Sequence, residues 1–370
     1  MANKAIKYRL YPTTEQAVMF VKTFGCCRKV YNLILTDKIA CYEETKAFGK
    51  QTPAMYKKEY PFLKEVDSLA LANVQLNLQS AMKNCFDKTR KKQNGFPKFK
   101  SAKHSRKSYT TNNQNGTVAI VENRSIKFPK IGKVKAKIHR MPEESWKLKS
   151  VTISQDSDGK FYASVLFEYE ATITRVALSD NAIGFDYKSN GLYIDSNGYC
   201  PDKKKYYRQN QDKLAHAQRK QKHRTIGSNN YKKQQLRIAN IQRHTSNQKF
   251  DYLHKESTKI ANLYDVVCVE SLDMKAISNK GFGNGKATLD NGYGMFLNML
   301  EYKLADRGKY FVKIDKWYPS SQLCSCCGKQ KKLTLTDRIY KCDDCGFAIN
   351  RDFNAAINIK NEGLRIRKST

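Results

Sequence analysis

The first part of the chain begins with an alternating pattern and continues with helical spacing. Apolar and basic residues alternate over residues 4–11, which predicts a strand with one exposed face. Apolar residues then recur at helical intervals over residues 13–40, where Thr13 and Gln16 have the spacing of a capping box. A second helical pattern covers residues 68–85. We therefore predict one strand followed by a helical region.

The next stretch, residues 88–107, is strongly basic and surrounds the turn Gly95-Phe-Pro-Lys-Phe99. Short alternating runs return between residues 118 and 138, and Asp158-Gly159 separates two further runs in the manner of a β-hairpin. These runs predict a small β-barrel or sheet to which the N-terminal strand adds. Candidate phosphate contacts in the basic loop are Lys91, Lys92, Lys98 and Lys100.

The second half of the chain mixes short strands with helices. Two strands, 182–187 and 192–195, are joined by a Ser-Asn-Gly turn, and the apolar run 266–269 has the composition of a buried parallel strand. Between them, residues 203–260 predict a long helical hairpin. The remaining predicted elements are a mobile Gly- and Asn-rich stretch over 278–294, a helix over 295–306 and a strand over 310–314. The whole pattern predicts an α+β multidomain protein.

Charge narrows the class of partner. The 370 residues contain 68 Lys and Arg against 34 Asp and Glu, which gives a net charge of +34. Such an excess attracts polyanions, so nucleic acid is the expected partner and an anionic membrane surface is the alternative. Because 40% of the residues are hydrophobic, the chain can build cores rather than remain a basic tail. No signal-peptide pattern and no apolar run of membrane-spanning length occurs, which predicts a cytoplasmic protein.

The excess charge is dense in the predicted helical hairpin, which holds 16 Lys and Arg residues and few acids. Solvated faces usually mix both signs, so we interpret this hairpin as a surface for phosphates, with tyrosines that could stack on bases. For any single lysine, a merely solvated side chain remains the alternative. The candidate contacts here are Lys204, Lys205, Tyr206, Arg208, Arg219, Lys220, Lys222 and Arg224.

Four of the 11 cysteines have the spacing of a zinc ribbon. Cys324-x2-Cys327 is followed after 14 residues by Cys342-x2-Cys345, and a glycine comes directly after each pair. Cys326 is a competing ligand, although a gap of one residue does not form the usual knuckle. A closed site of four thiolates is structural rather than catalytic, so we predict one structural Zn²⁺ at these four cysteines.

Three acids stand in contexts that are costly for a lone carboxylate. Asp186 interrupts an apolar strand, Glu270 ends another, and Asp352 stands where the last helix begins. For any one of them, pairing with an arginine or with a helix N-terminus is the simpler interpretation. Together they match the RNase H-like arrangement, in which carboxylates on a first strand, a later strand and a last helix hold two Mg²⁺ ions for phosphodiester hydrolysis.

Several motifs occur along the chain in a fixed order, namely Tyr8-Arg-Leu-Tyr-Pro12, Val30-Tyr-Asn32, Gly95-Phe-Pro-Lys-Phe99, Gly184-Phe-Asp186, Val269-Glu-Ser-Leu272, the cysteine pairs and Arg351-Asp-x-Asn-Ala-Ala-x-Asn358. They resemble the motifs of TnpB, the transposon-encoded nuclease family related to type V CRISPR effectors. Arg351 lies in the last motif and is a further candidate nucleic-acid contact. Lys188 stands two places after the first Asp, where the family commonly has glycine, and its ammonium would lower metal affinity or contact phosphate.

The resemblance implies an RNA-guided, Mg²⁺-dependent DNA endonuclease with Asp186, Glu270 and Asp352 as catalytic carboxylates. Its partners would be a guide RNA from the transposon end and double-stranded target DNA beside a short flanking motif; the chain would act as a monomer without a membrane or a small-molecule substrate. A nuclease-inactive RNA-guided repressor and a transposase that binds transposon ends are the alternatives. The implied domains are a β-barrel wedge (1–12 and 91–178), an inserted helical recognition domain (13–90), a RuvC-like nuclease domain (179–317 and 350–370) and a zinc ribbon (318–349).

Overall fold

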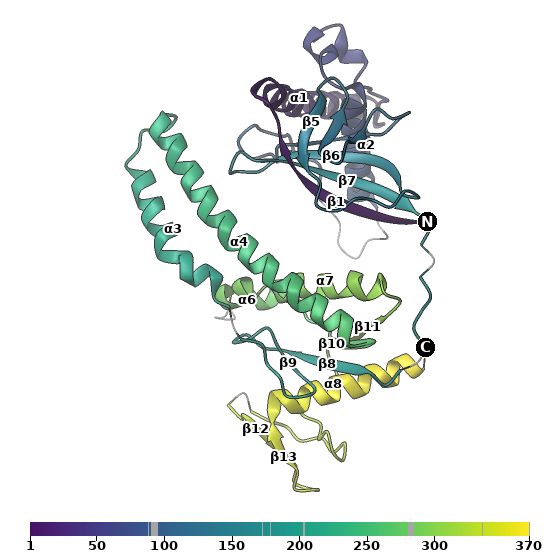
Figure 1. Cartoon of the computed structure of the whole chain (residues 1–370), viewed down its shortest axis with the longest axis vertical. Helices are drawn as coiled ribbons and strands as arrows, with labels where there is room; N and C mark the ends of the chain where they lie inside the picture. The colour runs from purple at the N-terminus through teal and green to yellow at the C-terminus, as the bar shows by residue number, and fades with distance from the viewer. Residues whose placement is uncertain are drawn as a thin grey trace. The chain divides into compact units, whose positions relative to one another are not determined.

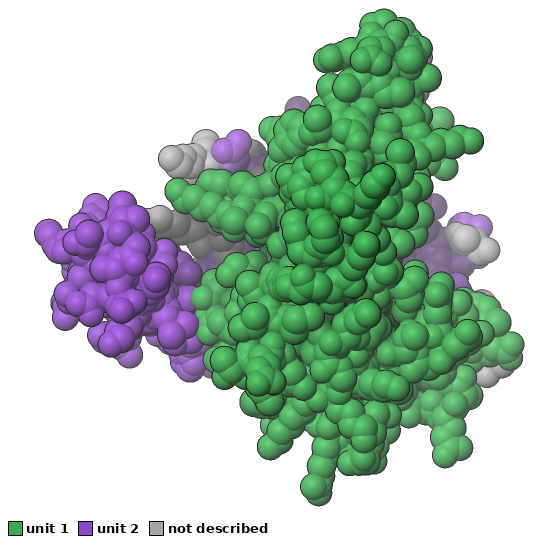
Figure 2. Space-filling model, turned by 90° about the horizontal axis from the view of Figure 1, so that it is seen from above, with its two compact units in different colours: residues 1–171 green, residues 172–370 purple. Residues whose placement is uncertain are grey.

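The computed structural model describes residues 1–87, 89, 95–171, 173–177, 179–202, 204–279, 285–334 and 336–369. The chain divides into two compact units, residues 1–171 and 172–370 (Figure 2). Each unit has its own hydrophobic core and is described by itself. In the part of the chain that the structure describes, no helix combines the length and the apolar character needed to cross a membrane.

The first unit is built on a seven-stranded antiparallel sheet with β1 (Ala2–Tyr11) near its middle (Figure 1). The predicted alternation of β1 is confirmed, because Ile6, Tyr8 and Leu10 are buried while the residues between them are more exposed. β1 pairs with β7 on one side and β5 on the other. In sheet order the other strands are β2 (Ser108–Asn112), β6 (Lys147–Gln155), β7 (Phe161–Tyr169), then β5 (Gly132–Lys137), β4 (Ser125–Phe128) and β3 (Ala119–Val121).

This sheet corrects two details of the sequence interpretation. It is an open, curled sheet rather than a closed barrel, because β2 and β3 stand at its two ends and are not paired with each other in the described residues. Strand β2 was not predicted, since its sequence Ser-Tyr-Thr-Thr-Asn has little apolar alternation. It forms because Tyr109 and Thr111 are buried beneath the helices, where the Thr111 hydroxyl donates to the carboxylate of Asp67.

Two helices cover the sheet of the first unit. α1 (Thr14–Thr45) begins with the predicted capping box, in which the Thr13 hydroxyl accepts from the backbone of Gln16 and the Gln16 side chain accepts from that of Thr13. α2 (Ser68–Phe86) begins at Asp67, and two short 3₁₀ turns, Met55–Lys57 and Pro61–Lys64, lie between the helices. Strands and helices share one hydrophobic cluster, so the sheet and the helical region form one core.

The second unit contains a four-stranded sheet in the order β11-β10-β8-β9. β8 (Ala182–Tyr187) and β9 (Tyr193–Asp195) are antiparallel, whereas β10 (Val266–Glu270) is parallel to both β8 and β11 (Tyr310–Ile314). The predictions of an opening hairpin and of a buried parallel strand are thereby confirmed.

Helices lie on both faces of this sheet. On one face, alternate strand residues such as Phe185 and Val267 pack against α4 (Asn229–Leu263) and α7 (Tyr293–Ala305). On the other face, Cys268 and its neighbours pack against α8 (Arg351–Lys368), which runs beneath the strands in Figure 1. Gly184 allows this close approach, because a Cβ there would lie 2.6 Å from the backbone nitrogen of Lys360.

The helical hairpin predicted over 203–260 is confirmed as α3 (Tyr206–Lys222) and α4, which run side by side (Figure 1). The mobile stretch predicted over 278–294 is wrong for residues 285–291, which form helix α6 (Gly285–Asn291) after the short α5 (Met274–Ile277), and for 293–294, which begin α7. Residues 280–284 of that stretch lie outside the described residues. α6 is held because the Asn291 amide donates to the carbonyl oxygens of Lys188 and Gly191. A two-stranded sheet, β12 (Ile339–Lys341) and β13 (Ala348–Asn350), precedes α8.

Candidate functional site

Strand register brings the first two candidate acids together. In the parallel pair β8–β10, Val269 lies opposite Phe185, so Glu270 and Asp186 follow at the same carboxyl edge of the sheet. Asp352 comes from a helix rather than from the sheet, and lies in the first turn of α8. The Asn350 side chain begins that helix by accepting from the backbone N–H groups of Asp352 and Phe353, at 3.0 Å and 3.2 Å.

The charges of these acids interact. Burial, followed by the charges of Asp352 and Glu270, raises the pKa of Asp186 from 3.8 to about 8. Burial also raises the pKa of Glu270. Tyr293, which sequence reasoning missed, closes the site on the α7 side; it is buried, and its pKa is raised by its own burial and then by the charges of Asp186 and Glu270. The edge of the sheet is therefore a partly buried, negative site.

Two cations flank Asp352. The Nζ atom of Lys188 lies 3.7 Å from its Oδ2, and the Nε atom of Arg351 lies 3.6 Å from its Oδ1. Arg351 also donates to the carbonyl oxygen of Thr334. Asp352 is thus partly neutralised by the protein, whereas Asp186 has no such ion pair in the described residues.

Carboxylate oxygens are the ligands that Mg²⁺ prefers, and Asp186 with two acids whose charges oppose its ionisation fits a divalent cation. The ligand atoms of the three carboxylates lie farther apart than those of the four thiols described next. Within the described ranges, the four cysteines are the group of metal-ligating side chains close enough to share one ion. The oxygen atoms of these acids and the mutual repulsion of their charges are therefore suited to a divalent metal ion.

The ligand atoms of Cys324, Cys327, Cys342 and Cys345 all lie within 4.8 Å of one another. The sulfur of Cys324 is 3.6 Å from that of Cys345, and the sulfur of Cys327 is 3.6 Å from that of Cys342. Zn–S bonds of about 2.3 Å in a tetrahedron place the sulfurs roughly 3.8 Å apart, so the spacing matches one zinc ion. Cys326 is not in the cluster, which removes it as a competing ligand.

The local backbone of the cysteine pairs favours thiolates. Gly328 and Gly346 have φ of 76° and 70°, which completes each tight turn after a cysteine pair. In the second pair, hydrogen bonds from the backbone N–H groups of Cys345 and Asp344 lower the pKa of the Cys342 thiol to about 7. A cation-binding thiolate is therefore accessible near neutral pH.

Two asparagines join the cysteine cluster to the helix that carries Asp352. The Asn354 carbonyl accepts from the backbone of Ser325, and its amide donates to the carbonyl of Leu323. The Asn358 amide donates to the carbonyls of Ser320 and Leu323 at 2.8 Å. Both side chains are buried on α8. The cluster and the acidic site thus share one helix, which gives a structural reason for the asparagines of the last motif.

The candidate nucleic-acid contacts fall into three groups. Lys91 and Lys92 lie outside the described residues. Four others already have contacts within the protein: Lys100 places its Nζ 3.9 Å from the centre of the Tyr31 ring, Tyr206 packs edge-on against Tyr252, Arg351 flanks Asp352, and the Nζ of Lys204 lies 3.8 Å from Oδ2 of Asp202. The remaining side chains are exposed, namely Lys98, Lys205, Arg208, Arg219, Lys220, Lys222 and Arg224.

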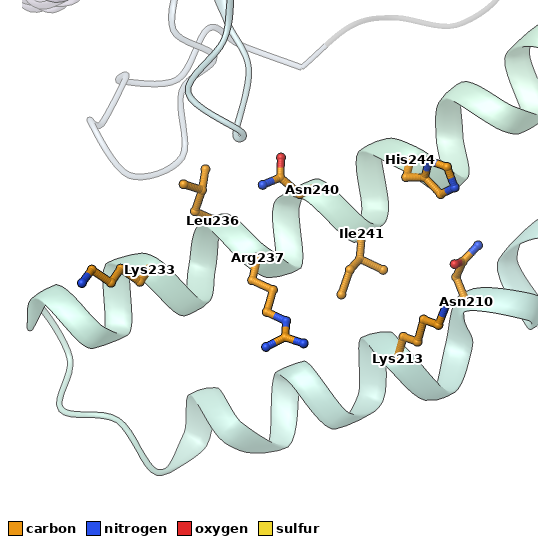
Figure 3. A pocket seen from close by; sticks show the side chains of 8 residues that line it. All are labelled: Asn210, Lys213, Lys233, Leu236, Arg237, Asn240, Ile241 and His244. Carbon is orange, nitrogen blue, oxygen red and sulfur yellow. The ribbon is translucent and has the colours of Figure 1, made fainter.

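The hairpin also holds a groove that the sequence did not indicate. It lies between α3 and α4 and has a volume of about 480 Å³. Figure 3 shows Arg237 and Ile241 of α4 pointing toward α3, and Lys213 and Asn210 of α3 pointing toward α4. Cations face the groove from both helices, so its electrostatics favour an anionic chain. The remaining lining residues are Lys233, Leu236, Asn240 and His244.

Comparison with known proteins identifies the family. A protein of Streptomyces pristinaespiralis, named as a putative RNA-guided DNA endonuclease, is 34% identical over 374 residues, which cover 98% of this chain and 89% of the relative. Family models described as a helix-turn-helix domain and a probable transposase, both of the IS605 OrfB type, match residues 1–47 and 164–280. The chain belongs to the TnpB family.

A second relative, a third family model and a solved structure also match this TnpB chain. InsQ of Escherichia coli, also named as a putative RNA-guided DNA endonuclease, is 28% identical over 96% of this chain and 91% of its own length. A model described as the Cas12f1-like TNB domain matches residues 293–359, which include the four cysteines. A solved Cas12f1 complex with guide RNA and target DNA has a TM-score of 0.53 at 13% identity, over 97% of this chain and 99% of that one, which shows a shared fold.

Proposed function

We propose that this TnpB chain is an RNA-guided DNA endonuclease and that Asp186, Glu270 and Asp352 are its catalytic carboxylates. The observation that carries the assignment is the electrostatic coupling of these acids: burial, followed by the charges of Asp352 and Glu270, raises the pKa of Asp186 to about 8. The names of the two full-length relatives support the activity. Guide-dependent cleavage would require a protein surface that binds nucleic acid, and the basic hairpin of α3 and α4 would provide one.

The three acids would hold two Mg²⁺ ions, which supply a water nucleophile at neutral pH and stabilise the leaving oxygen of the phosphodiester. The chain's own residues prepare the site. Tyr293 and the strands partly bury Asp186, and the first turn of α8 orients Asp352. Lys188 and Arg351 hold the position of the Asp352 carboxylate and offer positive charge to a DNA phosphate.

The four cysteines would hold a structural Zn²⁺. Their sulfur spacing fits a tetrahedral ion, and Asn354 and Asn358 fasten the first cysteine pair to α8. Zinc would thus stabilise the segment that presents Asp352. Through this helix, loss of zinc is expected to weaken the catalytic site without any contact between zinc and DNA.

The basic surfaces would bind a guide RNA from the transposon end and the RNA–DNA heteroduplex. Base pairing would supply target specificity, while the protein would read backbone shape and a short flanking motif. We assign residues 179–317 and 350–370 to a RuvC-like nuclease domain, 318–349 to a zinc ribbon, 1–12 and 91–178 to the wedge domain, and 13–90 to the recognition domain. One copy of the chain is proposed to act on each target.

The test uses the protein purified with its RNA. The complex is incubated with Mg²⁺ and plasmids that carry a guide-matched target beside randomised flanks. Linearisation that requires RNA and is lost in Asp186→Ala is expected. Guide-dependent binding without cleavage would indicate the repressor, and RNA-independent binding to transposon ends would indicate a transposase. Cleavage that persists in Asp186→Ala would refute the assignment of the site.

A further inference from the structure

The most exposed aromatic residue in the part of the chain that the structure describes is Trp317, in the turn that follows β11. It is 79% exposed, whereas the next most exposed aromatic residue, Phe99, is 58% exposed. A tryptophan ring is the largest apolar surface that a side chain offers, and leaving it in water forgoes the free energy of burial. Because single apolar residues are common on protein surfaces, this exposure acquires meaning only through the position and the rigidity of the turn.

The turn leaves the sheet at the edge that carries the candidate acids. Ile314 lies opposite Glu270 in the parallel pair β10–β11, and the Ile314 carbonyl accepts from the backbone N–H and the hydroxyl of Ser271 at 3.3 Å and 2.7 Å. Neighbouring strands lie about 4.8 Å apart, and three residues span at most about 10 Å. The Cα atom of Trp317 therefore lies within about 15 Å of the Cα atom of Glu270.

The turn is fixed at both ends, so the ring is held in its exposed position. The Asp315 carboxylate accepts from the backbone N–H of Trp317 at 2.7 Å, and the Asp315 carbonyl accepts from that of Tyr318 at 3.2 Å. Tyr318 itself packs against Ile314 and against Ile359 of α8. Because the backbone is already ordered, a ligand that contacts the ring has little conformational entropy to remove.

The ring and a neighbouring ammonium group together suit a nucleotide. The Nζ atom of Lys316 lies 4.5 Å from the centre of the Trp317 ring. Every nucleobase has a flat face that can stack on an aromatic ring, and the phosphate next to it pairs with a cation. Nearby acids are already engaged, since Asp315 closes the turn and Glu301 pairs with Lys313. The turn thus offers both a stacking surface and positive charge.

We propose that Trp317 stacks on an unpaired base of the DNA strand that is cleaved, a few nucleotides from the scissile phosphate. Bases inside a duplex or a guide–target heteroduplex already stack on their neighbours, so the base on the ring belongs to a single strand. The strand that enters the nuclease site is the one that passes this edge of the sheet. Stacking would fix the register of that strand relative to the acids. The inference rests on the proposed function and adds a residue that positions the substrate.

The first experiment measures tryptophan fluorescence of the full-length chain with its guide RNA. Asp186→Ala is the background, because the proposed function predicts that it binds DNA without cutting it. The chain has two tryptophans, so Trp146→Phe leaves Trp317 as the reporter. A guide-matched DNA target is expected to quench this emission, whereas a mismatched target is not. Trp317→Phe, which leaves Trp146, should show no comparable quenching.

Two results of this measurement would overturn the proposal. Quenching by the guide RNA before DNA is added would assign the ring to RNA. Quenching that follows protein concentration without DNA would assign the ring to a second copy of the chain.

The second experiment measures single-turnover cleavage in the presence of Mg²⁺. Trp317→Ala should cleave at least about fivefold more slowly than the wild type, and Trp317→Phe should keep most of the rate because it keeps an aromatic face. Affinity for the target should be unchanged, since base pairing with the guide sets it. Ile339→Ala is the control, because it removes another exposed apolar side chain, 66% exposed, from the same unit. Equal melting temperatures would exclude a structural effect.

The outcomes separate this inference from the proposed function. If the wild type cleaves a guide-matched target but Trp317→Ala cleaves equally fast and the Trp317 emission does not respond to DNA, the stacking role is refuted and the proposed function stands. If the wild type cleaves no guide-matched target, the proposed function fails and the stacking role fails with it.

Discussion

The raised pKa of Asp186 makes the metal-free acidic site a source of instability. Replacing Asp186 by asparagine removes the ionisable group, and the asparagine oxygen can still accept the hydrogen bond from the Tyr187 backbone. We therefore expect Asp186→Asn, which the proposed function predicts to be inactive, to be more stable than the wild type in buffer that contains EDTA.

The sign follows from proton linkage. The folded pKa of about 8 lies above the ordinary value of 3.8, so between these pH values the folded state binds more protons than the unfolded state. The free energy of unfolding of the wild type therefore falls as pH rises through this window, by up to about 1.4 kcal/mol per pH unit. The destabilisation is absent below the lower pKa and complete above the higher one.

The size of this destabilisation depends on how far the pH of the measurement lies above 3.8, the ordinary pKa of the carboxyl group. At pH 7 the full shift would cost about 4 kcal/mol, and the partial exposure of Asp186 reduces this to roughly 2–3 kcal/mol. The melting temperature of a unit of this size rises by about 2–4 °C for each kcal/mol added to its free energy of unfolding. Asp186→Asn should therefore melt roughly 5–10 °C higher than the wild type at pH 7. The gain should shrink to a small fraction of this near pH 4.

The assay is thermal unfolding of the C-terminal unit, within the full chain, in EDTA from pH 5 to pH 8. Asp212→Asn is the control, because it makes the same charge change at an exposed position of α3. Added Mg²⁺ should stabilise the wild type and narrow its difference from Asp186→Asn. The reasoning would be refuted if Asp186→Asn were no more stable than the wild type at pH 8, or if the difference did not grow with pH.

Three further predictions concern other parts of the second unit. Cys342→Ser should lose zinc, measured by metal analysis, and melt earlier, whereas Cys326→Ser should keep both its zinc and its melting temperature; equal zinc in both would contradict the ligand set. Lys188→Gln should bind Mg²⁺ about two- to fivefold more tightly in calorimetry, because it removes a cation 3.7 Å from Asp352, and unchanged affinity would count against that contact. Gly184→Ala should destabilise the unit by about 1–3 kcal/mol in urea unfolding, since its Cβ would press on the backbone of α8, and a neutral effect would show that α8 can shift away.

Structural features that depend on neighbouring residues could be predicted from the sequence. The alternation of β1, the capping box at Thr13, the two helices of the basic hairpin and the apolar run of β10 depend on residues within a few positions of one another. The cysteine pairs are equally local, because each pair and its glycine form one turn. The family followed from the order of such local motifs.

Features set by packing were missed. Strand β2 has a polar sequence and forms because Tyr109 and Thr111 are covered by the helices. Helix α6 lies in a Gly- and Asn-rich stretch and is held by the amide of Asn291. The open form of the first sheet depends on which distant strands pair, and alternation alone does not show whether the two edge strands meet.

The sequence by itself determined most of the elements, the cysteine pairs and the three acids as separate candidates, because each of these is specified by its neighbours along the chain. Only the tertiary structure decided that Asp186 and Glu270 lie at the same sheet edge and that the charge of Asp352 adds to the effect of burial on Asp186, since both depend on the parallel register of β8 with β10 and on the approach of α8 at Gly184.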